Sequence, residues 1–233
     1  MTINRRGALL AALALPAGCA IQPLTPVSTT PVQPPAGAGP LRAPVVGQRW
    51  TYRKLNFFNG SDLGSVQESV AAIGATIDIQ RVAGGGALAD EKHAVWGQLL
   101  RDPAWDYPMT FEAPVPLWPT PLAPGARASL ETRYRVDGGS VRFWIQVYSQ
   151  VRSWERITVG AGTFNALRVE RNIRIEHQDH LRAETTRRDV MWIAPEVGRW
   201  VARETSGTYR MQGQRMIDES PEDRFRWELT AWQ

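Results

Sequence analysis

Two histidines that could bind a metal ion stand close together, with His177 and His180 on either side of Asp179. Imidazole and carboxylate groups are zinc ligands, but structural sites usually have four ligands and catalytic sites have three that approach from different directions. A His-x-x-His pair shares one face only on a helix, and this pair falls between two strand patterns. The spacing therefore favours a solvated hairpin turn, and a hydrolase or metal-dependent enzyme stays open as an alternative function.

The other candidate motifs are incomplete. Residues 60–64 lack the Gly-x-Ser-x-Gly spacing of a nucleophile elbow, and residues 84–86 lack the lysine of a phosphate loop. The carboxylate pairs at residues 90–91 and 222–223 lie in polar segments that are typical of loop ends. We therefore expect a protein that is not an enzyme, with no catalytic residues, no metal site and no cofactor.

The basic residues do not form a nucleic-acid signature. Arg182, Arg187 and Arg188 alternate with Glu184 and Asp189, which favours a charged outer face over a phosphate-binding patch. The formal net charge is only +4, and part of it lies in the N-terminal segment. We expect no nucleic-acid partner.

Cys19 is the only cysteine, and it stands where a signal peptide would end. Arg5 and Arg6 precede a short apolar run and the small residues Ala17 and Gly18, an order typical of an export signal over residues 1–18. A cysteine after Ala-Gly resembles a bacterial lipobox, although Pro16 stands where leucine is usual. The pattern predicts that Cys19 is acylated and that palmitate is one of the attached acyl chains. The protein would then bind the membrane through this lipid anchor. Ordinary signal cleavage beside an unrelated cysteine is the alternative.

Two details of the export signal bear on the route and the destination. Arg5 and Arg6 resemble a loose twin-arginine signal, but they also suit a plain basic n-region, so both export routes stay open. Ala20 follows the cysteine in place of aspartate. In this respect the sequence resembles the outer-membrane sorting pattern of some bacteria, which implies a location on the periplasmic face of the outer membrane.

Residues 19–44 are dominated by Pro, Thr, Ala, Val and Gly. No apolar period occurs there, and such a segment buries too little surface to offset its ordering entropy. The composition predicts a disordered, proline-rich tether that holds a folded domain away from the lipid.

Residues 45–233 form the expected domain. Val141, Phe143, Ile145 and Val147 alternate with polar or mixed residues, which is the period of a half-buried strand. Similar short patterns recur up to residue 232 with glycine-rich turns between them, as in antiparallel structure. Residues 88–101 suit a helix or a strand. The prediction is all-β: a curved antiparallel sheet or half-open β-barrel.

A second proline-rich stretch, residues 103–124, interrupts this domain. It carries aromatic residues such as Trp105 and Trp118, which indicates packing against other elements. We expect an ordered crossover within a single domain. A domain boundary is the alternative, although the fifty or so residues before it would be marginally stable alone.

Four segments resemble motifs of the TapB-like bacterial envelope lipoproteins and related periplasmic β domains of unknown function. They are the opening Gly-Gln-Arg-Trp-Thr-Tyr at residues 47–52, Pro-Leu-Ala-Pro-Gly at 121–125, the Val-Gly-Ala-Gly-Thr-Phe region at 159–170, and Trp-Ile-Ala-Pro-Glu-Val-Gly at 192–198. The resemblance implies a strongly curved antiparallel sheet. It implies no chemistry, because the family has no catalytic residues to transfer.

The ten tryptophans are the unusual feature of the composition. Each can bury about 150–250 Å², so filling the core is one interpretation. The sharper one is an aromatic groove, for which Trp50, Trp118, Trp144 and Trp192 are the candidates. We expect a non-enzymatic, lipid-anchored envelope protein that acts as a binding or assembly module. Its partner would be a hydrophobic small molecule or another envelope protein, and a carrier of a hydrophobic ligand is the alternative.

Overall fold

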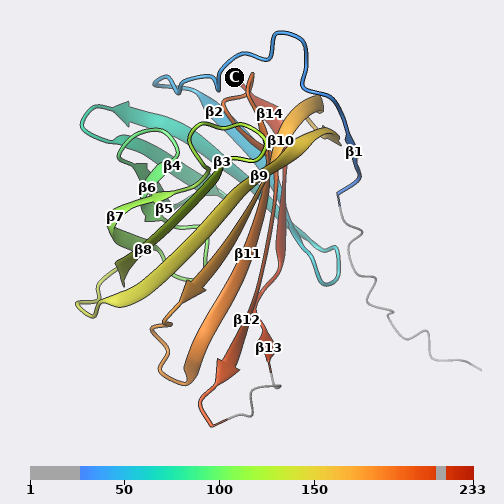
Figure 1. The fold of residues 1–233 in the computed structure, drawn as a ribbon. Helices are drawn as coiled ribbons and strands as arrows, with labels where there is room; N and C mark the ends of the chain where they lie inside the picture. The colour runs from blue at the N-terminus through green and yellow to red at the C-terminus, as the bar shows by residue number, and fades with distance from the viewer. Residues whose placement is uncertain (1–26, 214–218) are drawn as a thin grey trace, which may run out of the picture.

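The computed structural model describes residues 27–213 and 219–233, which form strands and loops (Figure 1). In this part of the chain there is no helix long and apolar enough to cross a membrane. Cys19 and the predicted signal peptide lie outside the described residues. The strands are β1 (Thr29–Pro31), β2 (Arg49–Asn56), β3 (Asp62–Ile73), β4 (Ile77–Ala83), β5 (Gly86–His93), β6 (Gln98–Asp102), β7 (Met109–Pro116), β8 (Arg127–Val136), β9 (Phe143–Val159), β10 (Gly162–Ile175), β11 (Arg182–Ala194), β12 (Arg199–Met211), β13 (Ser220–Pro221) and β14 (Phe225–Trp232).

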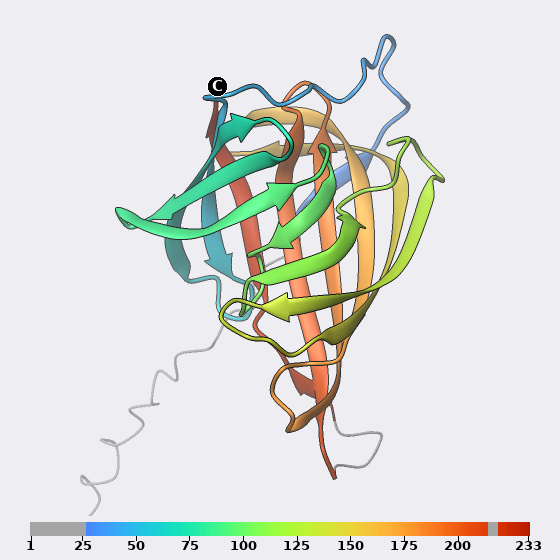
Figure 2. The same cartoon turned by 90° about the vertical axis from the view of Figure 1, so that its left-hand side faces the viewer.

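The strands form a closed antiparallel barrel (Figure 2). All strands except β1 and β13 follow one another around the ring, each paired with its neighbour in the chain. The ring closes because β14 pairs with β2, with Trp232 opposite Trp50. The predicted all-β fold is confirmed. The sequence predicted a curved sheet or a half-open barrel, and the structure is a barrel that is fully closed.

The tall wall of the barrel consists of β9 to β12, which are 13 to 17 residues long. The predicted alternation holds in β9, where Phe143, Ile145 and Val147 are buried. Val141, which the pattern placed in the same strand, precedes it and is 60% exposed. Residues 88–101, which suited a helix or a strand, form parts of β5 and β6.

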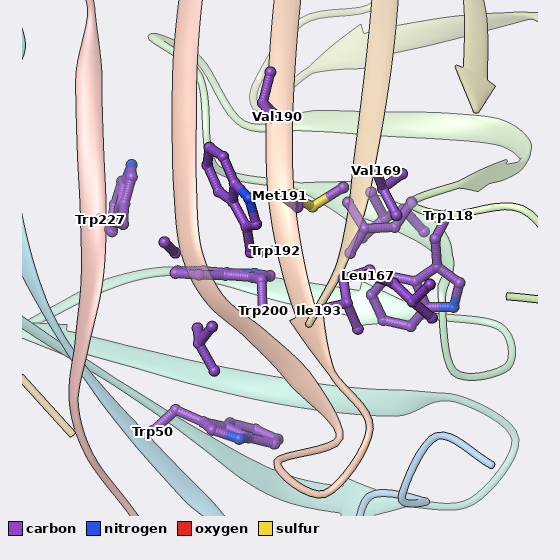
Figure 3. Packing of buried hydrophobic residues seen from close by; sticks show 14 of the residues in the cluster. Trp50, Trp118, Leu167, Val169, Val190, Met191, Trp192, Ile193, Trp200 and Trp227 are labelled. Atoms are coloured by element: carbon purple, nitrogen blue, oxygen red, sulfur yellow. The ribbon is translucent and has the colours of Figure 1, made fainter. Parts of the chain in front are cut away.

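Aromatic and aliphatic side chains fill much of the barrel (Figure 3). Tyr52 stacks on Trp200 with 3.7 Å between ring centroids, and the Tyr52 hydroxyl donates to the Trp200 carbonyl at 3.1 Å. Trp50 donates its indole N–H to the Val197 carbonyl at 3.2 Å. This packing supports the core-filling interpretation for these tryptophans.

The N-terminal segment differs from the expected tether. The prediction of disorder over residues 19–44 is wrong for residues 29–31, which form β1 and pair with Glu155 to Ile157 of β9. The reason is an unpaired edge: β8 covers β9 only as far as Gln150. Farther along, the Arg42 N–H donates to the Pro195 carbonyl at 2.9 Å, so the segment crosses the end of the barrel at the β11–β12 turn (Figure 1).

The proline-rich stretch at residues 103–124 belongs to the barrel, but it is only partly a crossover. It contains β7, which pairs with β6 only at its two ends, residues 109–110 and 115–116, and with β8 only from Met109 to Phe111. The loop that follows packs against the β5–β6 turn, with Leu117 and Trp118 buried and 5.7 Å between the ring centroids of Trp118 and Trp96. Prolines are compatible with this position because one side of β7 makes few ladder hydrogen bonds.

Candidate binding site at the mouth of the barrel

A cavity of about 640 Å³ opens at the end of the barrel away from the N-terminal segment. We call it the mouth cavity. Its size falls within the range of small-molecule sites. Its walls combine aromatic side chains with charged ones. The aromatic residues are Trp105, Tyr209, Phe225 and Trp227, and the charged residues are Lys54, Arg81, Asp106, Arg182, Arg187, Glu222 and Asp223.

One wall of the cavity is an ion-paired cluster that joins three separate segments. Arg187 of β11 donates to Asp106 Oδ1 at 2.8 Å and to Glu222 Oε2 at 2.7 Å. Arg182 donates to Glu222 Oε1 at 2.9 Å, and His177 Nε2 lies 3.2 Å from Asp106 Oδ2. We call these five residues the rim network. It ties the β6–β7 loop and the segment after β13 to β11.

The electrostatics of the rim network favour the charged state of Asp106. Burial alone would raise the pKa of Asp106, but the hydrogen bond from His177 and the charge of Arg187 hold it well below its usual range. The His177 ring accepts a hydrogen bond at Nδ1 from the Asp179 N–H at 3.0 Å. Its remaining proton therefore lies on Nε2, from which it is donated to Asp106.

The structure does not bring together the residues 177, 179 and 180 that were considered as an alternative metal cluster. His180 and Asp179 are exposed, whereas His177 is buried. The candidate ligand atoms of His177, Asp106 and Glu222 do lie within 4.8 Å of one another. However, the guanidinium groups of Arg182 and Arg187 already occupy these carboxylates, and their positive charge opposes a cation. The expectation that residues 177–180 form a turn agrees with the fold, because they connect β10 to β11.

None of the four tryptophans proposed for an aromatic groove lines the mouth cavity. Trp50 and Trp118 are buried core residues, and Trp192 donates its indole N–H to Glu155 Oε2 at 2.8 Å. Trp144 is half-buried beside Arg174, whose guanidinium carbon lies 6.0 Å from its ring centroid. The cavity takes Trp105 and Trp227 instead. The four candidates thus pack in the core or the wall of the barrel, and they do not form the predicted aromatic groove at this cavity.

Cations cover the aromatic walls of the mouth cavity. The Arg187 guanidinium carbon lies 4.6 Å from the Trp105 ring centroid, and that of Arg182 lies 4.1 Å from Tyr209. Lys54 Nζ lies 3.8 Å from the Phe225 centroid and 4.9 Å from that of Trp227. Such cation–π contacts are strongest when the cation is shielded from water, and they fix the aromatic rings in place.

Above the mouth cavity the barrel contains two further groups of buried charges. In the first, Arg199 bridges Glu68 and Glu91 at 2.7 and 2.9 Å, and Arg81 contacts Glu68 at 3.1 Å. Burial would raise the pKa of Glu91, but Arg199 and His93 lower it overall.

The second group is centred on Asp189, which accepts from Arg171 and Arg203 at 2.8 Å. The positive charge of these two arginines outweighs the effect of burial and lowers the pKa of Asp189. Asp102 acts on Arg203 electrostatically from nearby. In each group two acids face two arginines, so both groups are balanced.

Sequence reasoning misassigned several of these residues. Arg187 and Asp189 were expected on a charged outer face, but they are 2% and 0% exposed. Glu222 was expected at a solvated loop end, and it is instead the acceptor for two arginines. The sequence did contain a signal. Arg187 and Asp189 stand two residues apart and in step with the apolar Met191 and Ile193, so in a strand all four side chains point to the same face.

Two solved structures share this fold. One is a candidate lipoprotein from Parabacteroides distasonis ATCC 8503, with a TM-score of 0.52 and 14% sequence identity over 82% of this chain and 97% of that chain. The other is a candidate exported protein with a YmcC-like fold from Bacteroides fragilis NCTC 9343, with a TM-score of 0.51 and 14% identity over 83% of this chain and 98% of that chain. No protein-family model and no curated protein matches the sequence. At this identity the likeness shows the fold, and the TapB-like assignment stays a prediction.

Proposed function

We propose that this chain is a non-enzymatic envelope protein whose mouth cavity binds a polar small molecule. The observation that carries the proposal is the composition of the cavity: a preformed space of about 640 Å³ in which charged groups and aromatic rings line the same walls. Concave sites with a few fixed polar groups are where proteins usually bind ligands. The shared fold with a candidate lipoprotein and a candidate exported protein supports an envelope location.

The state of the titratable groups argues against catalysis in the cavity. A general acid or base needs a pKa near the working pH and access to the substrate. Asp106 has a lowered pKa and is held by Arg187 and His177, while both oxygens of Glu222 accept hydrogen bonds from arginines. These acids therefore act as fixed acceptors that shape the wall.

A carrier of an acyl chain is the less favoured alternative. Leu63, Val66 and Leu88 supply apolar surface to the cavity. However, an acyl chain would have to displace water from Lys54 and the rim network without offering them hydrogen bonds, which is costly for charged groups. An assembly role with another envelope protein would use outer surfaces and is compatible with ligand binding in the cavity.

Filling the cavity should abolish ligand binding. Ala104 lines the mouth cavity, and Ala104→Trp would occupy part of it; Ala38→Trp is the matched control in the exposed N-terminal segment. We expect ligand-observed NMR with a panel of monosaccharides, sugar acids and aromatic acids to show saturable binding to the wild type and to Ala38→Trp. That binding should weaken at least about tenfold in Ala104→Trp.

Two results would contradict the proposal. One is a panel in which no compound binds saturably, and the other is equal binding by Ala104→Trp and the wild type. Palmitate is included as a separate probe. Saturable binding of palmitate alone, lost in Ala104→Trp, would favour the carrier of a hydrophobic ligand.

We propose in addition that acylated Cys19 anchors the protein to the periplasmic face of the outer membrane, as the lipobox and the TapB-like motifs imply. Cys19→Ala should then move the protein from the membrane fraction to the soluble fraction of the envelope, because two or more acyl chains are what make such an anchor stable. Fractionation with immunodetection measures this, with Ala20→Ser as the neighbouring control. An unchanged membrane fraction for Cys19→Ala would refute the anchor.

A further inference from the structure

One cation of the mouth cavity, Lys54, takes part in no ion pair within the described part of the chain. Acids and arginines balance two against two in the rim network and in both buried groups above it. Lys54 belongs to none of these groups. The exposed Asp223 also lines the cavity and acts on Lys54 electrostatically, but it forms no ion pair with it. Among the described residues, no carboxylate oxygen lies within 4.0 Å of its Nζ atom and no acceptor receives a hydrogen bond from it.

The surroundings of Lys54 make this charge available to a ligand. The side chain lines the cavity, with its ammonium group over the Phe225 and Trp227 rings. Burial and the nearby charge of Arg81 lower the pKa of Lys54, and exposed Asp223 opposes this only in part. The ammonium group is thus partly shielded from water, faces a second positive charge, and keeps its three N–H donors unused.

Two further unused polar groups of the cavity are donors. Trp105 and Trp227 line it, and neither indole N–H donates to an acceptor among the described residues. The carboxylates of the rim network, by contrast, already accept from Arg182, Arg187 and His177. A ligand that binds these donors must therefore supply acceptors, and an anionic acceptor group would also form the ion pair that Lys54 lacks.

We propose that the mouth cavity binds a ring-bearing organic anion, with its carboxylate or phosphate group at Lys54 and its ring against the aromatic wall. This inference rests on the proposed function and adds the chemical class of the ligand. The cavity volume of about 640 Å³ accommodates a molecule of one or two six-membered rings.

Isothermal titration calorimetry with matched probes tests the charge requirement. D-glucuronate and D-glucose 6-phosphate are compared with D-glucose, and 4-hydroxyphenylacetate is compared with its neutral alcohol. At least one anion should bind about tenfold or more tightly than its neutral counterpart, as expected for a hydrogen-bonded charge. The probe that binds identifies the group as carboxylate or phosphate and the ring as sugar or aromatic.

The chain offers a matched pair of variants because Lys54 and Lys92 are its only lysines. Lys54→Met should remove the preference for the anion, and Lys54→Arg should restore most of it. Lys92→Met should keep the full preference, since Lys92 lies outside the cavity and pairs with Asp78 at 3.4 Å. Thermal unfolding of each variant establishes that the fold is intact.

Amine labelling gives a second, independent measurement. The anion should protect Lys54 from acetylation, as followed by peptide mass spectrometry, and leave Lys92 unprotected. The inference is overturned if the neutral probe binds as tightly as the anion, if Lys54→Met keeps the preference, or if no anion binds saturably up to about 10 mM. A neutral compound that binds the wild type and is lost in Ala104→Trp would overturn the anion inference alone and leave the cavity as the binding site.

Discussion

Arg199→Met should lower the free energy of unfolding by about 3–5 kcal/mol, because it leaves a buried charge without its partner. Arg199 is fully buried and donates to both Glu68 and Glu91. Glu68 keeps Arg81 when Arg199 is lost, but Glu91 keeps only His93. Glu91 would then have to stay charged at a high desolvation cost or take up a proton. Equilibrium unfolding in urea measures the change.

Two further variants isolate the cause of this loss. Arg156→Met, an exposed site, should change the free energy of unfolding by less than about 1 kcal/mol. The double variant R199M/E91Q should recover part of the loss, since the amide that replaces the carboxylate carries no charge and can still hydrogen-bond with His93. If the double variant is no more stable than R199M alone, the cost comes from the lost packing of Arg199 on Trp50 and Trp200.

The sequence predicted the strands of this barrel because side-chain alternation is local. Phe143, Ile145 and Val147 read as one buried face from neighbouring residues alone. Closure depends instead on the pairing of Trp50 with Trp232, which joins the first and last strands of the ring. No local pattern separates an open curved sheet from a closed one, so the prediction stopped at a half-open barrel.

The rim network was hidden for the same reason. The partners Asp106 and Arg187 are 81 residues apart, and Arg187 and Glu222 are 35 apart. In a single sequence each reads as a solvated charge, since lone acids and arginines are mostly exposed. Only the curvature of the sheet turns one side of β11 into the inside of a barrel. The inward face of β11 also carries the charged residues Arg187 and Asp189, so this part of the strand lacks the apolar alternation from which a buried face is predicted.

The same limit applies to the tether. Its proline-rich composition predicted disorder, but β9 extends beyond β8 and offers an unpaired edge to residues 29–31. Backbone hydrogen bonds to an existing edge need little side-chain burial. Composition describes what a segment can bury by itself, and it contains no information about an edge formed more than a hundred residues later.

Gly97→Ala should destabilise the barrel more than any glycine substitution at an open turn. Gly97 has a positive φ of 86°, and a Cβ atom there would lie 2.5 Å from the Trp118 ring. Its carbonyl also accepts from the Leu117 N–H at 2.8 Å, which holds the loop after β7 against the β5–β6 turn. The left-handed backbone costs an alanine about 1–2 kcal/mol, and overpacking against a buried ring adds about 1–3 kcal/mol.

Gly125→Ala separates these two costs, because Gly125 has the same φ of 86° and no atom lies within 4 Å of the place that a Cβ atom would take. It should therefore show only the backbone cost in urea unfolding. In a Trp118→Leu background the ring is gone, so Gly97→Ala should then cost no more than Gly125→Ala, which a double-mutant cycle measures. Equal costs for the two glycines in the wild-type background would show that the loop moves away freely. Trp118 would then be a loosely held side chain and not a fixed part of the core beside the β5–β6 turn.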